Sequence, residues 1–277
     1  MCDVCVMNAV RERMLSRRDL FRRAAGGAAA VAAVSTGAAT LAPAPARAAA
    51  GGGPVDLTHE LHEAFPTFFG EQQFFVETLF DYAQHKFNLN MLRVNEHTGT
   101  HVDAPLHFSA DGQSVAEVPV ENLVAPLAVI DIRAKAAEDP DAQVTPDDVA
   151  AWIARNGPLP ERCCVAMLSG WGAHVNEAGF RNADAEGVMH FPGFHLEAAR
   201  MLLEESTAVG IAVDTLSLDH GPSPDFATHY AWLPENRWGL ECVANLEALP
   251  EAGATIVVGA PKHRGGSGGP ARVLALV

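Results

Sequence analysis

The chain has 277 residues and a net charge of −15 at pH 7, from 34 acidic and 19 basic side chains. This acidic balance argues against nucleic acid as a partner, because binding a phosphate backbone requires a basic face. The basic residues are unevenly spread, since the first 48 residues hold seven arginines and only three acidic residues. The amino-terminal segment is therefore expected to be a unit of its own.

Residues 1–48 have the pattern of a cleavable export signal. Arg17 and Arg18 precede an apolar stretch from about residue 24 to residue 41, and an A-x-A site ends at Ala48. This pattern resembles a twin-arginine signal, which predicts the twin-arginine export machinery as a partner and a periplasmic or extracellular mature protein. A basic arm or a membrane anchor is the alternative. An anchor needs about 20 strongly apolar residues, and this run is mostly Ala, Gly and Thr, so no membrane association is expected after cleavage.

The cysteines do not form a recognisable framework. Cys2 and Cys5 have C-x-x-C spacing, but they lie in the segment expected to be removed. The other three are Cys163, Cys164 and Cys242, an odd number that includes an adjacent pair. The sequence therefore predicts no disulfide framework in residues 49–277, which are long enough for one domain with a sizeable core.

Residues 49–277 alternate short apolar runs with a few helical patterns. One helix is expected at Thr145–Gly157, with Thr145 as N-cap, a proline at the first position and Gly157 as the stop, and another at Phe194–Ser206. Strands are expected at Asn88–Asn95, Leu127–Ile132, Cys164–Ser169, Gly210–Leu216, Thr255–Gly259 and Arg272–Val277. Long Gly/Pro-rich connections separate these elements. Together they predict a mixed α/β domain with a substantial sheet and large functional loops.

The segment EHTGTHVDAPLHF, residues 96–108, concentrates the ligand-type side chains His97, His101, Asp103 and His107. A glycine and a proline within it oppose a helix. We expect a strand that ends in a tight turn and folds His101 and Asp103 back beside His97, with residues 101, 103 and 107 on one side of an extended segment. Each histidine alone is more typical of a cap or a core residue. Two imidazoles and a carboxylate gathered in this way can bind Zn, Mn or Fe(II) and leave positions open for water.

The pattern H-x-G-T-H-x-D-x-P-x-H is complete from His97 to His107. It resembles the signature of the cyclase family of metal-dependent hydrolases, which includes bacterial kynurenine formamidase and isatin hydrolase. The stretches VDLTHEL, GWG, HFPGF, DTLSLDHGPS and GGPARVLALV are similar to the family too. The resemblance implies that residues 49–277 form a single mixed-sheet domain of the swivelling β/β/α type, opening with a strand at VDLTHEL. It also implies a homodimer or a larger homo-oligomer.

The resemblance implies that His97, His101 and Asp103 hold a first metal. In the formamidase branch a second metal is held by the shared aspartate, a later histidine and a glutamate twelve residues beyond it, and His229 and Glu241 have this separation. The alternative is that they are a loop histidine and a surface glutamate. Members similar to isatin hydrolase use one metal, so the expected cofactor is one or two divalent ions, Zn or Mn.

A divalent ion lowers the pKa of a bound water from about 15.7 to near 7, which supplies hydroxide at neutral pH. His107 is the proton donor and acceptor that the resemblance implies, and an imidazole with a pKa near 6.5 suits this task. The predicted reaction is hydrolysis of a small non-peptide amide, either an aryl formamide or a cyclic amide such as a lactam. A lactonase or cyclase at the same site is an alternative, and so is a metal- or ligand-binding protein without turnover.

Several other residues are candidates for contact with a small-molecule substrate. Phe68 and Phe69 stand where kynurenine formamidases typically carry a tryptophan, and two more phenylalanines follow at 74–75. These rings suit an apolar or aromatic substrate, with simple packing as the alternative. Trp171, between two glycines, is either a pocket wall or core, and His220 either contacts substrate or stabilises a turn.

Two further polar stretches predict no chemistry of their own. SLDHGPSPD, residues 217–225, contains Ser, Asp and His, but neither of its serines lies in the G-x-S-x-G elbow that a catalytic triad of this kind would need. GGSGG, residues 265–269, lacks the Lys-Ser/Thr of a phosphate loop and is expected to be a flexible turn.

Overall fold

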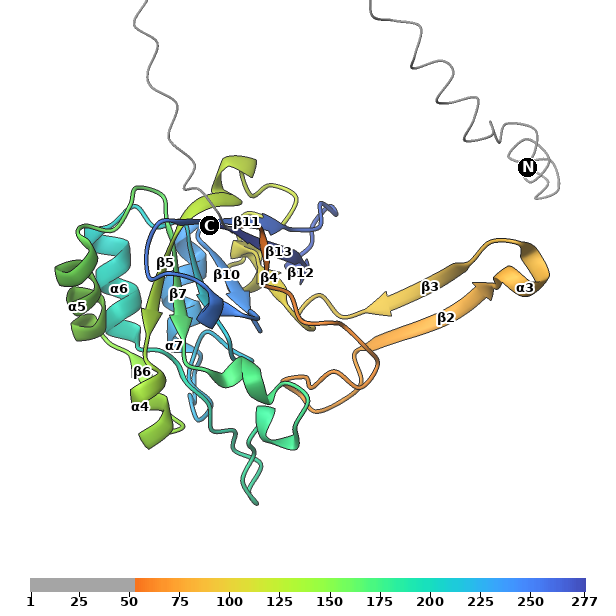
Figure 1. The fold of residues 1–277 in the computed structure, drawn as a ribbon, viewed down its shortest axis with the longest axis horizontal. Helices are drawn as coiled ribbons and strands as arrows, with labels where there is room; N and C mark the ends of the chain where they lie inside the picture. The colour runs from red at the N-terminus through yellow and green to blue at the C-terminus, as the bar shows by residue number, and fades with distance from the viewer. Residues whose placement is uncertain (1–52) are drawn as a thin grey trace, which may run out of the picture. The chain divides into compact units, whose positions relative to one another are not determined.

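The computed structural model describes residues 53–277, so the predicted export signal lies outside the described residues. Nine strands in this part form one sheet in the order β1-β13-β11-β5-β7-β9-β10-β4-β12 (Figure 1). Strands β5, β7, β9 and β10 run parallel, and the flanking pairs are antiparallel. The strands are β1 Val55–Asp56, β4 His101–Asp103, β5 Val124–Asp131, β7 Cys164–Leu168, β9 Gly210–Val213, β10 Trp238–Glu241, β11 Ala254–Gly259, β12 Gly268–Pro270 and β13 Arg272–Leu276.

The sheet curls so that its two ends approach each other. β12 is the last strand in the order and β13 is the second, yet only Ala271 separates them along the chain. The Ala271 N–H donates to the carbonyl of Thr100, just before β4, at 2.9 Å. Val102 of β4 and Val273 of β13 accordingly belong to one buried cluster. The inner face of the curled sheet is therefore one continuous apolar core.

Helices cover the outer face of the parallel strands. Trp152, Leu202 and Trp232 from three helices pack with Ile130 and Met167 of the strands. Because both faces of these strands are buried, their sequences are continuous apolar runs rather than alternating ones. The helices are α3 Tyr82–His85, α4 Arg133–Glu138, α5 Pro146–Asn156, α6 Leu196–Glu205 and α7 Ala227–Trp232, and the short strands β6 Gln143–Val144 and β8 Gly193–Phe194 pair outside the main sheet.

The start of α5 shows why the local sequence predicts this helix well. The Asp148 carboxylate accepts hydrogen bonds from both the N–H and the hydroxyl of Thr145, each at 2.7 Å. Pro146 fills the first helical position, where a missing N–H costs nothing. Gly157 ends the helix at a positive φ of 89°. The prediction for this helix is confirmed, and so is the one for α6.

All six predicted strands are present with shifted ends. β9 stops at Val213, three residues before the predicted end. The reason is the buried carboxylate of Asp214, which accepts hydrogen bonds from the N–H groups of Ser169, Gly170 and Trp171. A side chain, rather than a strand ladder, thus joins the ends of β7 and β9.

A hairpin of β2 Phe74–Phe80 and β3 Leu89–Val94 forms a separate two-stranded sheet. Figure 1 shows it extending away from the main sheet, with α3 near its tip. Every residue of β3 is exposed, among them Met91 at 50% and Leu92 at 58%. The sequence predicts β3 but does not predict β2, whose phenylalanines at 74–75 are interpreted instead as candidate contacts for an aromatic substrate.

The described residues thus form a single mixed α/β domain built on a curled mixed sheet, as predicted. Its more specific assignment to the swivelling β/β/α type stays a prediction of the resemblance. Cys163, Cys164 and Cys242 are free and buried, which confirms that they form no disulfide. From residue 53 to the carboxyl terminus, no helix combines the length and the apolarity needed to span a membrane.

Candidate metal centre and active site

The turn before β4 gathers the ligand-type residues, as the sequence predicts. β3 ends at Val94, the chain turns through Gly99 at a φ of +69°, and β4 begins at His101. The positive φ favours glycine at this position, and a Cβ there would also displace the Leu61 methyl carbon, which would lie 2.9 Å away. β4 pairs antiparallel with β10, which places Glu241 directly opposite His101.

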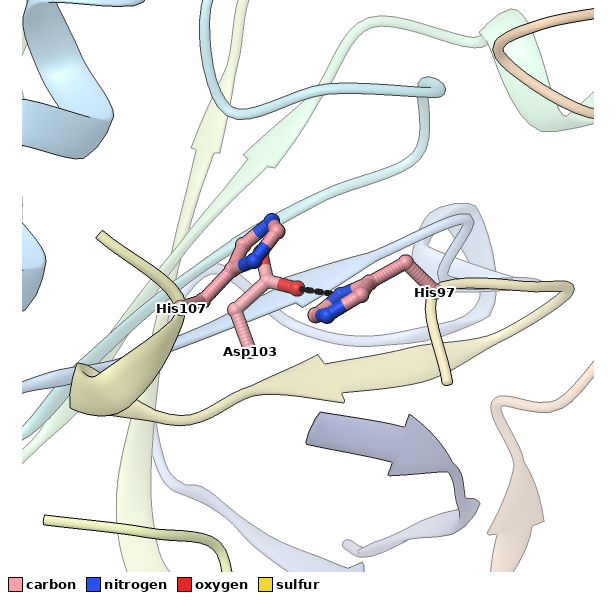
Figure 2. Close-up of side chains that lie close together, drawn as sticks. All are labelled: His97, Asp103 and His107. Atoms are coloured by element: carbon pink, nitrogen blue, oxygen red, sulfur yellow. Dashed lines mark hydrogen bonds and ion pairs between the residues drawn. The ribbon is translucent and has the colours of Figure 1, made fainter. Parts of the chain in front are cut away.

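Asp103 lies at the centre of the cluster and is fully buried. Its Oδ1 is 2.7 Å from His97 Nδ1 and 3.3 Å from His101 Nε2. Its Oδ2 is 3.7 Å from His229 Nε2. Figure 2 shows His97 and His107 approaching Asp103 from the segments before and after β4. One oxygen of Asp103 therefore faces two imidazoles, and the other oxygen faces a third.

Glu241 closes the other side of the cluster from the end of β10. Its Oε2 lies 3.3 Å from His101 Nε2, and its Oε1 lies 3.2 Å from His229 Nε2. The backbone N–H of Leu218 donates to Oε1 at 3.0 Å and fixes the carboxylate. Two buried carboxylates thus share the same histidines.

The outward nitrogen of each imidazole has its own acceptor. His101 Nδ1 lies 2.8 Å from the carbonyl of Gly99, and His229 Nδ1 lies 2.6 Å from Asp219. His97 Nε2 lies 2.9 Å from the hydroxyl oxygen of Ser267. When these nitrogens carry the ring proton, the inward nitrogens turn their lone pairs toward the two carboxylates. This is the usual arrangement around metal-ligating histidines.

The buried carboxylates of the cluster favour a positive charge beside them. Burial opposes ionisation of Asp103, but the neighbouring imidazoles of His101, His229 and His97 outweigh it and hold its pKa well below the usual range. Burial lowers the pKa of His101, yet the carboxylates of Asp103 and Glu241 outweigh it and raise this pKa to about 10. The pKa of His229 is raised well above its ordinary value by the same competition. Protons on the histidines or a divalent cation can supply this charge.

The donor set fits a divalent metal. His101 Nε2 and Asp103 Oδ2 are buried without a hydrogen-bond partner, which is costly unless an ion satisfies them. Two sets of ligand atoms have all members within 4.8 Å of one another: His97, Asp103 and His107 in one, and His101, Asp103 and Glu241 in the other. Nitrogen and oxygen donors of this kind suit Zn or Mn. The first set includes His107, which the sequence predicts to be a proton carrier.

His107 differs from the other histidines in its surroundings. It ends a 3-10 turn at Pro105–His107 rather than continuing the extended segment, so that part of the prediction is wrong. The turn still brings its ring face to face with His97, with centroids 3.7 Å apart. Burial lowers the pKa of His107 to about 4, although the Asp103 carboxylate opposes it. His107 is therefore neutral at pH 7 and a weaker base than a free imidazole.

The cluster opens into a cavity of about 280 Å³. Among its lining residues are the predicted substrate contacts Phe68 and Phe69, and neither a lysine nor an arginine lines it. The predominantly apolar, aromatic lining favours a small uncharged ring. The full lining is Pro66, Thr67, Phe68, Phe69, His97, Thr98, Gly99, His101, His107, Phe108, Leu216, Ser217, Phe226, His229, Glu241 and Cys242.

Two predicted substrate contacts lie elsewhere. Trp171 is buried behind the cavity wall, in the same apolar cluster as Leu216 and Cys242, and its indole N–H donates to the carbonyl of Phe180 at 2.8 Å. His220 is half-buried and does not line the cavity. The phenylalanines at 74–75 lie on β2, also outside the cavity lining.

Sequence reasoning missed several residues at the site. Asp219 binds the outer nitrogen of His229. Metal-ligating histidines usually have a carboxylate or carbonyl partner of this kind, so looking for such a partner in the sequence could have identified Asp219. Phe226 lines the cavity at the start of α7 and has a φ of +53°, which no sequence pattern indicates. Ser267 lies in the segment expected to be a flexible turn. That expectation is wrong in part, because Gly268 and Gly269 belong to β12 and pair with β4.

Comparison with known proteins identifies the family. The family model described as putative cyclase matches residues 55–220. The chain belongs to this cyclase family. It is 35% identical to the isatin hydrolase of Roseibium aggregatum over 201 residues, which cover 69% of this chain and 75% of that protein. The structure of isatin hydrolase A from Ralstonia solanacearum matches 81% of this chain and 91% of its own with a TM-score of 0.76 and 38% identity.

The formamidase branch of the cyclase family is similar over a shorter stretch. The kynurenine formamidase of Salinibacter ruber is 49% identical over 49 residues, which cover 18% of this chain and 23% of that protein. With the cluster around Asp103, these matches show that the chain is a metal-dependent hydrolase that cleaves amide bonds. The cofactor is a divalent metal.

Proposed function

We propose that this enzyme hydrolyses the ring amide of a small, uncharged aromatic lactam of the isatin type. The observation that carries the proposal is the direct opening of the Asp103 cluster into a cavity lined by Phe68, Phe69, Phe108 and Phe226. Isatin hydrolases are similar to the chain over most of its length. An aryl formamide is the second candidate, supported by the shorter formamidase match. A formamide with an amino-acid group is disfavoured, because none of the described lysines and arginines lines the cavity to pair with its carboxylate.

His97, His101 and Asp103 would hold one divalent ion, Zn or Mn, and Asp103, His229 and Glu241 would hold a second where two bind. Such an ion supplies a water of lowered pKa and polarises a carbonyl oxygen. The chain itself fixes the histidine rings through the acceptors on their outer nitrogens. The aromatic walls hold the substrate ring and exclude bulk water from the polar cluster.

His107 would carry the proton. Its neutral ring accepts a proton from the attacking water and delivers it to the departing nitrogen. This delivery matters because an amide nitrogen leaves poorly unless it is protonated. Stacking on His97 holds the His107 ring in place during both transfers.

A substrate panel tests the proposal. Purified protein is stripped of metal, reloaded with Zn or Mn, and offered isatin, formanilide and phthalide as lactam, aryl formamide and lactone. We expect isatin to be turned over at least about tenfold faster than the other two, because only a well-matched ring places its carbonyl beside the cluster. Faster turnover of phthalide would favour the lactonase alternative. Metal binding without turnover of any member would favour a binding protein.

Export of the enzyme is part of the proposal, carried by residues 1–48. A mature enzyme in the periplasm or outside the cell would meet incoming aromatic compounds. The test is cell fractionation with the full chain and with the Arg17→Lys/Arg18→Lys double variant. We expect the unchanged chain to be processed and exported by the twin-arginine machinery. Equal export of the double variant would contradict this route.

The hairpin supports a homodimer or larger homo-oligomer. A two-stranded hairpin alone is marginally stable in water, and β3 exposes Leu89, Met91 and Leu92 along its length. A second copy of the chain would cover these side chains. Light scattering on the purified protein should give at least twice the chain mass. The Met91→Glu/Leu92→Glu variant should be monomeric.

A further inference from the structure

The backbone of Ser267 holds this residue beside the Asp103 cluster. It directly precedes β12, whose Gly268 is paired with Asp103 of β4. The N–H of Ala104, the residue after β4, donates to the Ser267 carbonyl at 2.8 Å and extends the β4–β12 pairing by one residue. Because two strands fix this segment, the Ser267 side chain has a defined position rather than that of a loop residue.

The side chain of Ser267 links a metal-ligand candidate to a carboxylate. Its Oγ lies 2.9 Å from His97 Nε2 and donates to Glu96 Oε2 at 2.5 Å. The backbone N–H of Ser267 donates to the same Glu96 oxygen at 3.2 Å. The other oxygen of Glu96 lies 2.6 Å from His263 Nε2. Glu96 is therefore held on both of its oxygens.

The direction of these hydrogen bonds determines the tautomer of His97. A serine hydroxyl has one proton, and the short contact assigns it to Glu96. Its oxygen then accepts from His97 Nε2–H. The lone pair of His97 Nδ1 is then available to a divalent ion on the side of Asp103, whereas without an ion a proton must lie between Nδ1 and Asp103 Oδ1, which are 2.7 Å apart.

The neighbouring glycines keep this chain of contacts intact. A Cβ on Gly268 would lie 2.7 Å from His97 Cε1, which forces the ring to move. A Cβ on Gly266 would lie 2.7 Å from Glu96 Oε1, on the far side of the carboxylate. The glycines of GGSGG thus allow close approach of the backbone to His97 and Glu96.

We propose that Ser267 and Glu96 are positioning residues that orient His97 and fix its tautomer for metal binding. The inference rests on the proposed role of His97 as a metal ligand. Neither residue lines the cavity, so both act through His97 rather than by touching substrate. Partners of this kind typically contribute about 10- to 100-fold to metal affinity.

The experiment measures Zn and Mn affinity by competition with a chromophoric chelator, on the metal-stripped full chain and on Ser267→Ala, Glu96→Gln and Ser267→Thr. We expect Ser267→Ala to bind about 10- to 100-fold more weakly and Glu96→Gln about tenfold more weakly. Ser267→Thr keeps the hydroxyl and should recover most of the affinity. Thermal unfolding of the metal-free variants shows whether the fold itself has changed.

Ser114→Ala is the matched control. Ser114 donates its N–H and its hydroxyl to one oxygen of Glu117, at 2.9 and 2.6 Å, but it touches none of the candidate ligands. The Ser114→Ala variant should bind Zn and Mn with the same affinity as the unchanged chain. If Ser267→Ala and Glu96→Gln also keep full affinity, the positioning role is wrong while the metal site stands. If the unchanged chain binds neither metal, the proposed function fails together with this inference.

Discussion

His107 lies face to face with His97, with ring centroids 3.7 Å apart and planes inclined by 16°. The contact joins the proposed proton carrier to a metal-ligand candidate, and the surroundings of the two rings differ. His97 Nδ1 faces Asp103, and its Nε2 is taken by Ser267. His107 instead lines the aromatic cavity. Substitutions at these two positions should therefore have different effects.

His107→Ala should leave metal binding intact and lower turnover of the lactam by about 10²- to 10⁴-fold, the usual contribution of general acid–base catalysis. Metal content and hydrolysis rate are measured on the same preparation. His220→Ala is the control, since His220 lies outside the cavity lining and should leave both unchanged. Loss of metal from His107→Ala would instead make His107 a ligand, as its distance to His97 and Asp103 allows.

Asp103→Asn should weaken metal binding more than Glu241→Gln does. Asp103 faces His97 and His101 with one oxygen and His229 with the other, whereas Glu241 faces only His101 and His229. Elemental analysis after desalting gives the metal retained by each variant. Asp214→Asn is the control for removing a buried carboxylate. Equal losses from Asp103→Asn and Glu241→Gln would contradict the central position of Asp103.

Metal binding should release protons and strengthen as pH rises. Ligands bind in the deprotonated form, and in the metal-free protein the pKa of His101 is about 10. Because this pKa is raised above the unfolded value near 6.5, protonated His101 stabilises the metal-free fold fully below pH 6.5. This stabilisation is lost as pH rises through about 10.

Calorimetric titration of metal at pH 7, in two buffers of different ionisation enthalpy, counts the protons released. Thermal unfolding of the metal-free protein between pH 7 and 10 follows the loss of stability. Heat that does not depend on the buffer, with a melting temperature that does not fall toward pH 10, would contradict the charge assigned to His101.

Phe226→Ala should raise KM for the lactam by about tenfold with a small change in kcat. Phe226 lines the cavity between Phe68 and Phe108, with ring centroids 5.8 and 5.6 Å away. Removing its ring takes away apolar contact made equally in the ground and transition states, which affects KM rather than kcat. Steady-state kinetics measures both constants. Phe74→Ala, on β2 outside the cavity lining, should change neither.

Much of the fold is readable from local sequence because its signals are local. Thr145, Pro146 and Gly157 define α5 within thirteen residues, and the buried parallel strands are unmistakable apolar runs. The ligand turn at 97–103 is predicted for the same reason, since Gly99 provides the left-handed turn. Sequence neighbours determine these features, so a sequence pattern records them.

The parts that were missed depend on distant pairing. β12 is a strand because Gly268 pairs with Asp103, and nothing within GGSGG indicates this partner. Glu241 meets His101 only because β10 pairs with β4, and His229 reaches Asp103 and Glu241 from α7. Their role therefore followed from the family resemblance rather than from spacing alone. Trp171 packs behind the cavity wall, which agrees with core packing, one of the two alternatives that a tryptophan between glycines leaves open.

The most direct test of the account is a titration of metal into the stripped protein, with bound metal and isatin hydrolysis measured in every sample. We expect no turnover without metal, and turnover that rises in proportion to bound Zn or Mn until the Asp103 cluster is filled. Full hydrolysis by metal-free protein, or a hydrolysis rate that does not depend on the amount of metal bound, would contradict this expectation.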